Sequence, residues 1–164
     1  MGFAGVGERV HNLRPLQTIL AGGLLAGVLD IFDAIVVTIV RGGTPTRMFQ
    51  YIASGLIGPS SFQGGWPTAA LGLLCHFVIA TTWAAVYFFA ARRITWMLRR
   101  PVFSGLVFGL LVYGFMNYVV LPLSGVPKPI RTPPIPLLIN GVLAICLLVG
   151  LPIALITARA FRRS

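Results

Sequence analysis

Two acidic side chains within an apolar stretch are the residues of this sequence best suited to chemistry. Asp30 and Asp33 both lie in the stretch 16–40. Side chains three residues apart share one side of a helix. A carboxylate within a bilayer is costly unless it finds a proton, a partner or water, and two close carboxylates compete for a proton. The pair therefore predicts a protonatable site.

Other apolar stretches also contain strongly polar residues. A helix rises about 1.5 Å per residue, and counting inward at that rise puts these residues in the same half of the membrane as the acidic pair. We expect one polar pocket between the helices, open to the outside, formed by Asp30, Asp33, His76, Tyr113, Asn117 and Asn140. The alternative is a hydrogen-bond network that only fixes helix packing. Function is favoured for the acidic pair, and packing for His76, Asn117 and Asn140 taken singly.

Metal and cofactor chemistry finds less support in the sequence. A site of two Asp and one His is conceivable, but the repeated ligand spacing of a metal motif is missing. His76 is the only histidine in an apolar stretch, which excludes bis-His haem within one chain and leaves open a haem or pigment shared between chains. The only lysine, Lys128, lies in a loop, so a retinal Schiff base is excluded. We expect bound lipid and neither metal nor cofactor.

Catalysis is not predicted. The DxxD motif occurs once, whereas a diphosphate site that binds magnesium needs more acidic ligands than one such motif supplies. Ser60 and Ser61 precede His76 without a GxSxG motif. We therefore expect a protein that is not an enzyme.

Composition points to a membrane as the setting of these residues. The chain of 164 residues is 57% hydrophobic and only 10% charged, with a mean hydropathy of +0.90, whereas soluble domains are roughly 25% charged. An apolar stretch of about 20 residues is enough to cross a bilayer as a helix. The stretches that meet this length are 16–40, 68–91, 102–123 and 135–158. They predict an all-α bundle of four transmembrane helices in one membrane domain, 1–164.

The basic residues predict the orientation of the bundle. The formal charge of +10 would suggest a nucleic-acid partner in a soluble chain, but between apolar stretches it indicates topology and contact with anionic lipid headgroups. The two ends and the middle loop carry nine basic residues, and the other two loops carry four. Both termini are therefore predicted to be cytoplasmic. The first apolar stretch is too long for a signal peptide and contains two Asp, so we expect it to remain.

The two outer loops differ in character. Thr44, Pro45 and the Gly58–Pro59 pair mark the start and end of a helix over 45–57. Phe49, Ile52, Ala53 and Leu56 would share one face, which predicts an amphipathic helix lying on or dipping into the outer leaflet. Trp66 would anchor the chain at the interface. The second loop, 124–134, is rich in proline and predicts a stiff spacer.

Small residues indicate where helices approach closely. Gly23 and Gly27 form a GxxxG motif in the first stretch, and Gly105 and Gly109 form another in the third. These motifs predict packing between the first and third helices or across a dimer. Pro152 predicts a kink in the fourth helix. Cys75 and Cys146 are expected to be buried thiols rather than a disulfide.

Three segments carry a family resemblance. The stretch GLVFGLLVYGFMNYVVLPLSGVPKP, with AGGLLAGVLD and GLLCHFVIA before it, resembles the YagU-like group of small bacterial inner-membrane proteins. The longer outer loops of that group are missing here. The resemblance implies a location in the bacterial inner membrane and says nothing about mechanism.

Two functions remain open from the sequence. The first is a protein, expected to be oligomeric, whose outward-facing pocket binds or conducts a proton, a cation or a small solute. The second is an accessory subunit that packs against a larger membrane complex through its glycine faces and outer helix. In both, the site opens outward, and a continuous pore through one chain is not expected.

Overall fold

Long apolar helices make up most of the chain. The computed structural model describes residues 4–127 and 134–162, and these contain helices and no strand. Four helical segments are long and apolar enough to cross a membrane: Pro15–Val40, Gly65–Arg93, Pro101–Leu123 and Ile135–Arg162. The prediction of an all-helical chain with four such segments is confirmed, with boundaries shifted by a few residues.

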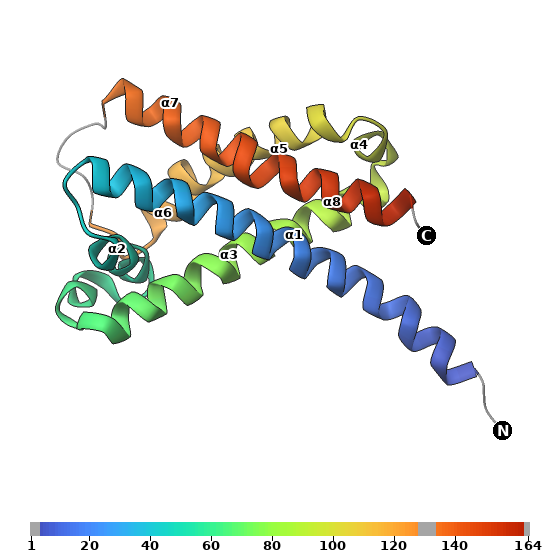
Figure 1. The fold of residues 1–164 in the computed structure, drawn as a ribbon, viewed down its shortest axis with the longest axis horizontal. Coiled ribbons are helices and arrows are strands. Elements are labelled where there is room, and N and C mark those ends of the chain that lie inside the picture. The colour runs from blue at the N-terminus through green and yellow to red at the C-terminus, as the bar shows by residue number, and fades with distance from the viewer. Residues whose placement is uncertain (1–3, 128–133, 163–164) are drawn as a thin grey trace.

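The helices follow one another with short connections (Figure 1). The first span lies in α1 (Ala4–Val40), and the second is α3 (Gly65–Arg93). The third is built from α5, η2 and α6, and the fourth from α7, η3 and α8. Their bounds are α5 Pro101–Phe115, η2 Met116–Val120, α6 Leu121–Leu123, α7 Ile135–Ala144, η3 Ile145–Gly150 and α8 Leu151–Arg162. Three short helices, α2 (Pro45–Ile57), η1 (Gly58–Gln63) and α4 (Thr95–Arg99), connect the spans. Of these, η1 and α4 were not predicted.

Proline interrupts the third and fourth spans in the same way. The segments η2 and η3 are π-helical, and Pro122 and Pro152 each lie two residues beyond the end of one of them. Proline lacks an N–H group, and its ring clashes with the carbonyl four residues earlier, so a wider turn before it relieves the clash. The irregularity predicted at Pro152 is therefore a π-helical segment.

The two GxxxG motifs lie against different helices from those expected. A Cβ atom at Gly23 would come within 2.5 Å of Thr81 Cα, which shows that this motif packs against α3. A Cβ atom at Gly109 would come within 2.5 Å of Cys146 Cα in η3. The predicted contact between the first and third spans is therefore wrong. Each motif instead packs against the next membrane-spanning segment along the chain, the second span for Gly23 and the fourth for Gly109.

The helix α2 has the predicted bounds and crosses the end of the bundle that is remote from α4 (Figure 1). The Thr44 side chain accepts a hydrogen bond of 3.4 Å from the Arg47 N–H, as an N-cap residue should. The residues of the predicted apolar face differ in their burial within the protein: Ala53 is buried and Leu56 is 70% exposed, and Gln50 is buried as well. The reason is that α2 packs directly on α3, where Gly72 leaves room for the α2 backbone.

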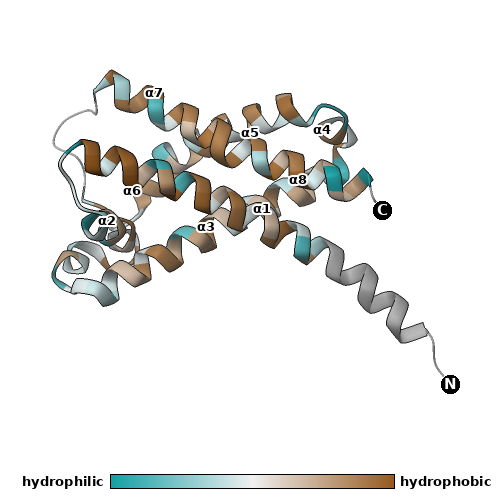
Figure 2. Ribbon diagram, viewed as in Figure 1, coloured by the Kyte–Doolittle hydropathy of each residue, from teal (hydrophilic) through white to brown (hydrophobic). Residues whose placement is uncertain are grey.

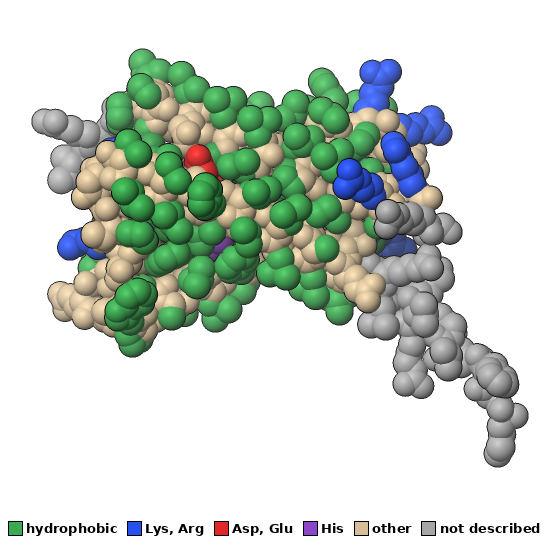
Figure 3. Space-filling view, viewed as in Figure 1, with side chains coloured by type: hydrophobic (Ala, Val, Ile, Leu, Met, Phe, Trp, Pro, Cys, Tyr) green, Lys and Arg blue, Asp and Glu red, His purple; other side chains and the backbone are tan. Residues whose placement is uncertain are grey.

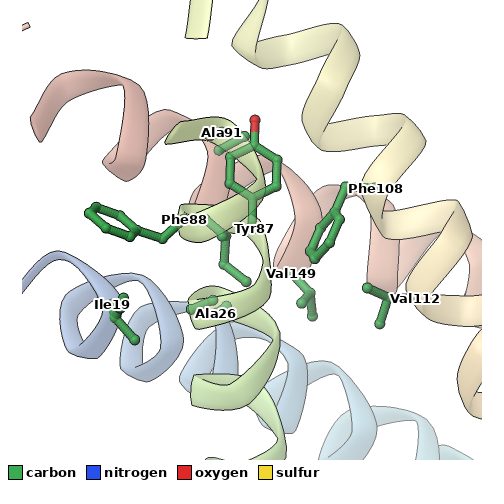
Figure 4. Packing of buried hydrophobic residues seen from close by; sticks show 11 residues of the cluster. Ile19, Ala26, Tyr87, Phe88, Ala91, Phe108, Val112 and Val149 are labelled. Carbon is green, nitrogen blue, oxygen red and sulfur yellow. The ribbon is translucent and has the colours of Figure 1, made fainter. Parts of the chain in front are cut away.

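An aromatic cluster packs in the half of the bundle near α4 (Figure 4). Tyr87 is fully buried and meets Phe108 edge to face at 5.0 Å between ring centroids. Its hydroxyl lies 2.7 Å from Ser104 Oγ. Met97 and Phe161 pack against this cluster from α4 and α8. Aromatic contacts therefore join α3 to the helices around it in this half of the bundle.

The surface of the bundle is strongly apolar along the spans (Figure 2). Basic side chains, which are all Arg in the described part of the chain, lie at the two ends of the molecule, with a hydrophobic belt between them (Figure 3). The described ends of α1 and α8 lie at the same end of the bundle (Figure 1). This arrangement is expected of a chain that crosses a membrane an even number of times.

Candidate functional site

A cavity of about 280 Å³ lies among the four spans, toward the end of the bundle crossed by α2. Every span contributes to its lining, and α2 and the segment after α6 add lining residues at that end. The polar or aromatic members of the lining are Asp30, Tyr51, His76, Trp83 and Ser124. The others are apolar: Ile31, Ala34, Ile52, Gly55, Ile79, Ala80, Val112, Met116, Val120, Leu121, Val126, Ile145 and Val149.

Both π-helical segments border the cavity. Met116 and Val120 come from η2, and Ile145 and Val149 come from η3. A π-helical turn is wider than an α-helical turn and is found preferentially at functional sites. The prolines that end these segments thus shape the wall of the cavity.

His76 is held against α1 by a single hydrogen bond. Its Nε2 lies 2.9 Å from the Gly27 carbonyl oxygen, so Nε2 carries the proton and donates. In a neutral imidazole this leaves Nδ1 as an acceptor. The missing side chain at Gly27 brings α3 close enough for the bond, since a Cβ there would meet the Phe77 ring at 2.8 Å.

Asp30 lies three residues beyond Gly27 on α1 and lines the same cavity. It is half-buried. His76 and Asp33 are the ionisable side chains near it. Among the described residues no side chain forms a hydrogen bond or an ion pair with Asp30. The carboxylate therefore lines a largely apolar space together with the His76 imidazole.

Asp33 has a different partner. Asn140 Nδ2 in α7 donates a hydrogen bond of 3.0 Å to Asp33 Oδ2. Neither residue is part of the cavity lining. The two carboxylates that were predicted to act together thus face different neighbours.

The remaining predicted site residues also lie outside the cavity lining. Tyr113 packs its ring against α7, where a Cβ at Gly141 would meet it at 3.1 Å. Asn117 is exposed, and its Nδ2 donates to the Tyr113 carbonyl of its own span at 2.9 Å. Of the six predicted residues, the structure brings only Asp30 and His76 together in the cavity.

The sequence contained a signal for the residues that were missed. Ile79, Ala80 and Trp83 follow His76 at the spacings i+3, i+4 and i+7, which place them on one helical face. All three line the cavity. Tyr51 and Ser124 had no such signal, because their positions depend on how α2 and the segment after α6 fold over the end of the bundle.

Tyr51 is the titratable residue of the lining that lies outside the spans. Burial raises the pKa of its phenol. The hydroxyl therefore stays protonated at neutral pH and can donate a hydrogen bond. Within the described part of the chain, no three His, Cys, Asp or Glu side chains are grouped so that they could hold a metal ion.

Comparison with known proteins yields no relative: no protein-family model, curated protein or solved structure matches the chain. The resemblance to the YagU-like group stays a prediction.

Proposed function

We propose that this chain is a multi-pass protein of the bacterial inner membrane that binds a small solute in the cavity and catalyses no reaction. The observation that carries the proposal is the position of Asp30 and His76 in a cavity that is largely apolar and is bounded by all four spans. Sites for small molecules are typically apolar with a few well-placed polar groups. Acidic residues within transmembrane helices are usually functional.

The orientation of the bundle makes this an outward-facing site. The end that carries α4 and the end of α8 holds most of the basic residues, and such ends lie in the cytoplasm. The cavity lies toward the opposite end, under α2. The half near α4 holds the packed Tyr87–Phe108 cluster. A binding site that opens outward therefore fits better than a continuous pore.

Binding should involve protons. A carboxylate in apolar surroundings is stable only with a proton or a cation. His76 offers a second protonatable nitrogen, Nδ1, close to the same space. A solute that enters the cavity therefore competes with protons or replaces them.

The fluorescence of Trp83 provides a direct test of solute binding, because this residue lines the cavity. Trp66 and Trp96 are 77% and 46% exposed, so both can be replaced by Phe to leave one reporter. We expect bromobenzene, a small apolar quencher, to quench Trp83 in a saturable way in lipid nanodiscs. Gly55→Leu should abolish saturation, because the new side chain would lie beside Val126 and Ser124 in the lining.

Asp33→Asn is the matched control for this experiment. It changes a carboxylate outside the cavity and keeps an oxygen that can accept from Asn140. Saturable quenching should persist in this variant. Quenching that rises linearly with bromobenzene in every variant would mean that the probe reaches Trp83 only from the lipid, and would refute the proposal.

Assembly with other chains, as a homo-oligomer or as an accessory subunit, is a separate prediction. Both GxxxG motifs already pack within the chain. A partner would therefore contact other surfaces, and native mass analysis after mild extraction would detect it.

A further inference from the structure

We propose that the ligand of this cavity is a small organic cation: an ammonium group on an apolar body. This inference rests on the function proposed above and names the class of solute. It follows from what the cavity offers to a ligand: one carboxylate, one imidazole acceptor and a large apolar wall.

The charge of the lining selects a cation. Among the described residues that line the cavity, Asp30 is the only acidic one, and none is Lys or Arg. The Nε2–H of His76 is occupied by the Gly27 carbonyl, so the neutral ring presents an acceptor. An anionic ligand would find repulsion from Asp30, whereas an ammonium group finds a carboxylate and an acceptor nitrogen.

The lining distinguishes an organic cation from a metal ion. Hard cations such as Ca²⁺ take about six to eight oxygen ligands. The lining provides the Asp30 carboxylate and the hydroxyls of Tyr51 and Ser124 as side-chain oxygens. The rest is aliphatic or aromatic and would leave a metal ion without its hydration, but it can cover a hydrocarbon body.

Aromatic residues add to the attraction for such a ligand. Tyr51 and Trp83 line the same space as Asp30. An ammonium group over the face of such a ring gains cation–π energy, and most over Trp. The volume of about 280 Å³ lies near the lower limit of the roughly 300–1,000 Å³ found for small-molecule sites. The ligand is therefore small.

Two compounds of nearly identical shape test the charge requirement. Benzyltrimethylammonium carries a quaternary nitrogen where 2,2-dimethylpropylbenzene has a carbon. Each is titrated against the protein saturated with bromobenzene, in nanodiscs of zwitterionic lipid, and displacement is followed by recovery of Trp83 fluorescence. Zwitterionic lipid removes the general attraction of cations to an anionic surface.

We expect Asp30→Asn to weaken displacement by the cation at least about tenfold and displacement by the hydrocarbon less than about threefold. Asp33→Asn should change each by less than about threefold. Because the displacement by each compound is compared between variants, the partition of that compound into the lipid cancels from the comparison. Equal losses for the two compounds in a folded Asp30→Asn protein, or none for the cation, would overturn the inference.

Thermal unfolding in the same nanodiscs reports whether each variant is folded. If Asp30→Asn does not fold, Asp30→Glu decides, because it keeps the carboxylate and must keep the preference for the cation. If the unaltered protein and Asp30→Glu each bind the cation no more tightly than the hydrocarbon, the inference is overturned, although solute binding itself still stands. Absence of saturable bromobenzene quenching would instead refute the proposed function itself.

Discussion

Asn140 in α7 donates a hydrogen bond of 3.0 Å to Asp33 in α1, and this contact gives the two acidic residues of α1 different surroundings. Asp33 is paired with an amide across a helix interface. Asp30, three residues earlier, lines the cavity with His76. Positions three apart on a helix differ by about 60° in direction, which is enough for them to meet different helices when neighbours lie on both sides.

The Asp33–Asn140 contact should contribute measurably to stability. Asn140→Ala removes the donor and leaves the carboxylate without a partner. Hydrogen bonds between transmembrane helices contribute about 0.6 kcal/mol on average and up to about 1.7 kcal/mol. We expect a loss of roughly 1 kcal/mol in the free energy of unfolding, measured by denaturation with SDS in mixed micelles.

A double-mutant cycle shows whether the loss belongs to this pair. Asn140→Ala in an Asp33→Ala background should cost less than the same change in the unaltered protein. Strictly additive costs would mean that the hydrogen bond does not contribute to stability.

The glycines of the third span differ sharply in how much space surrounds them. A Cβ atom at Gly109 would lie 2.5 Å from Cys146 Cα, whereas one at Gly114 would meet nothing within 4 Å. Gly109→Ala must therefore separate the third and fourth spans, at a cost of about 1–3 kcal/mol. Gly114→Ala adds the same methyl group in open space and should be neutral or stabilising by up to about 1 kcal/mol.

Thermal unfolding in detergent, measured side by side, checks this pair of variants. Equal melting temperatures for Gly109→Ala and Gly114→Ala would contradict the tight packing of the third span on η3.

The fold was predictable because length and hydropathy alone determine which segments can cross a bilayer. The α2 bounds were predictable as well, since Thr44, Pro45 and Gly58 act locally on the backbone. Neither prediction required knowledge of which helices are neighbours.

The candidate site was predictable only in part, for the opposite reason. Depth along the spans was inferred from residue counts, but the direction of each side chain around its helix was not. Asp30 and His76 were expected to meet, and both line the cavity, whereas Tyr113 contacts α7 and Asn117 turns back to its own backbone. The GxxxG motifs similarly indicate close approach without identifying the partner helix.

The orientation proposed for the bundle leads to a prediction about the C-terminus. Arg159 and Arg162 lie in the last turns of α8, at the same end as the Arg92 and Arg93 pair that ends α3. A green fluorescent protein fused after Ser164 should be fluorescent in bacteria, because it folds in the cytoplasm. Alkaline phosphatase fused there should be inactive, because it needs the oxidising periplasm. The reverse result would place the cavity on the cytoplasmic side.

Cation binding in the cavity should weaken as pH falls. The ionisable side chains near Asp30 are His76 from α3 and Asp33 on its own helix, and Tyr51 from α2 lines the same cavity. Burial raises the pKa of Tyr51, so its phenol stays protonated throughout a titration from about pH 8 to about pH 5 and does not contribute. Protonation of Asp30 removes the negative charge, and protonation of His76 adds a positive one. Both changes act against a cation, so affinity is greatest at the alkaline end and is lost toward the acidic end.

The variant His76→Gln distinguishes the effect of a proton on Asp30 from the effect of a proton on His76. Glutamine can still donate an N–H to the Gly27 carbonyl, so the contact between α1 and α3 is kept, but the side chain no longer titrates. One competing proton lowers affinity by at most about tenfold per pH unit. We therefore expect the affinity for benzyltrimethylammonium to fall more steeply in the unaltered protein than in this variant. The hydrocarbon of the same shape should bind independently of pH in both. An affinity for the cation that rises on acidification would show that a group other than Asp30 governs the cavity.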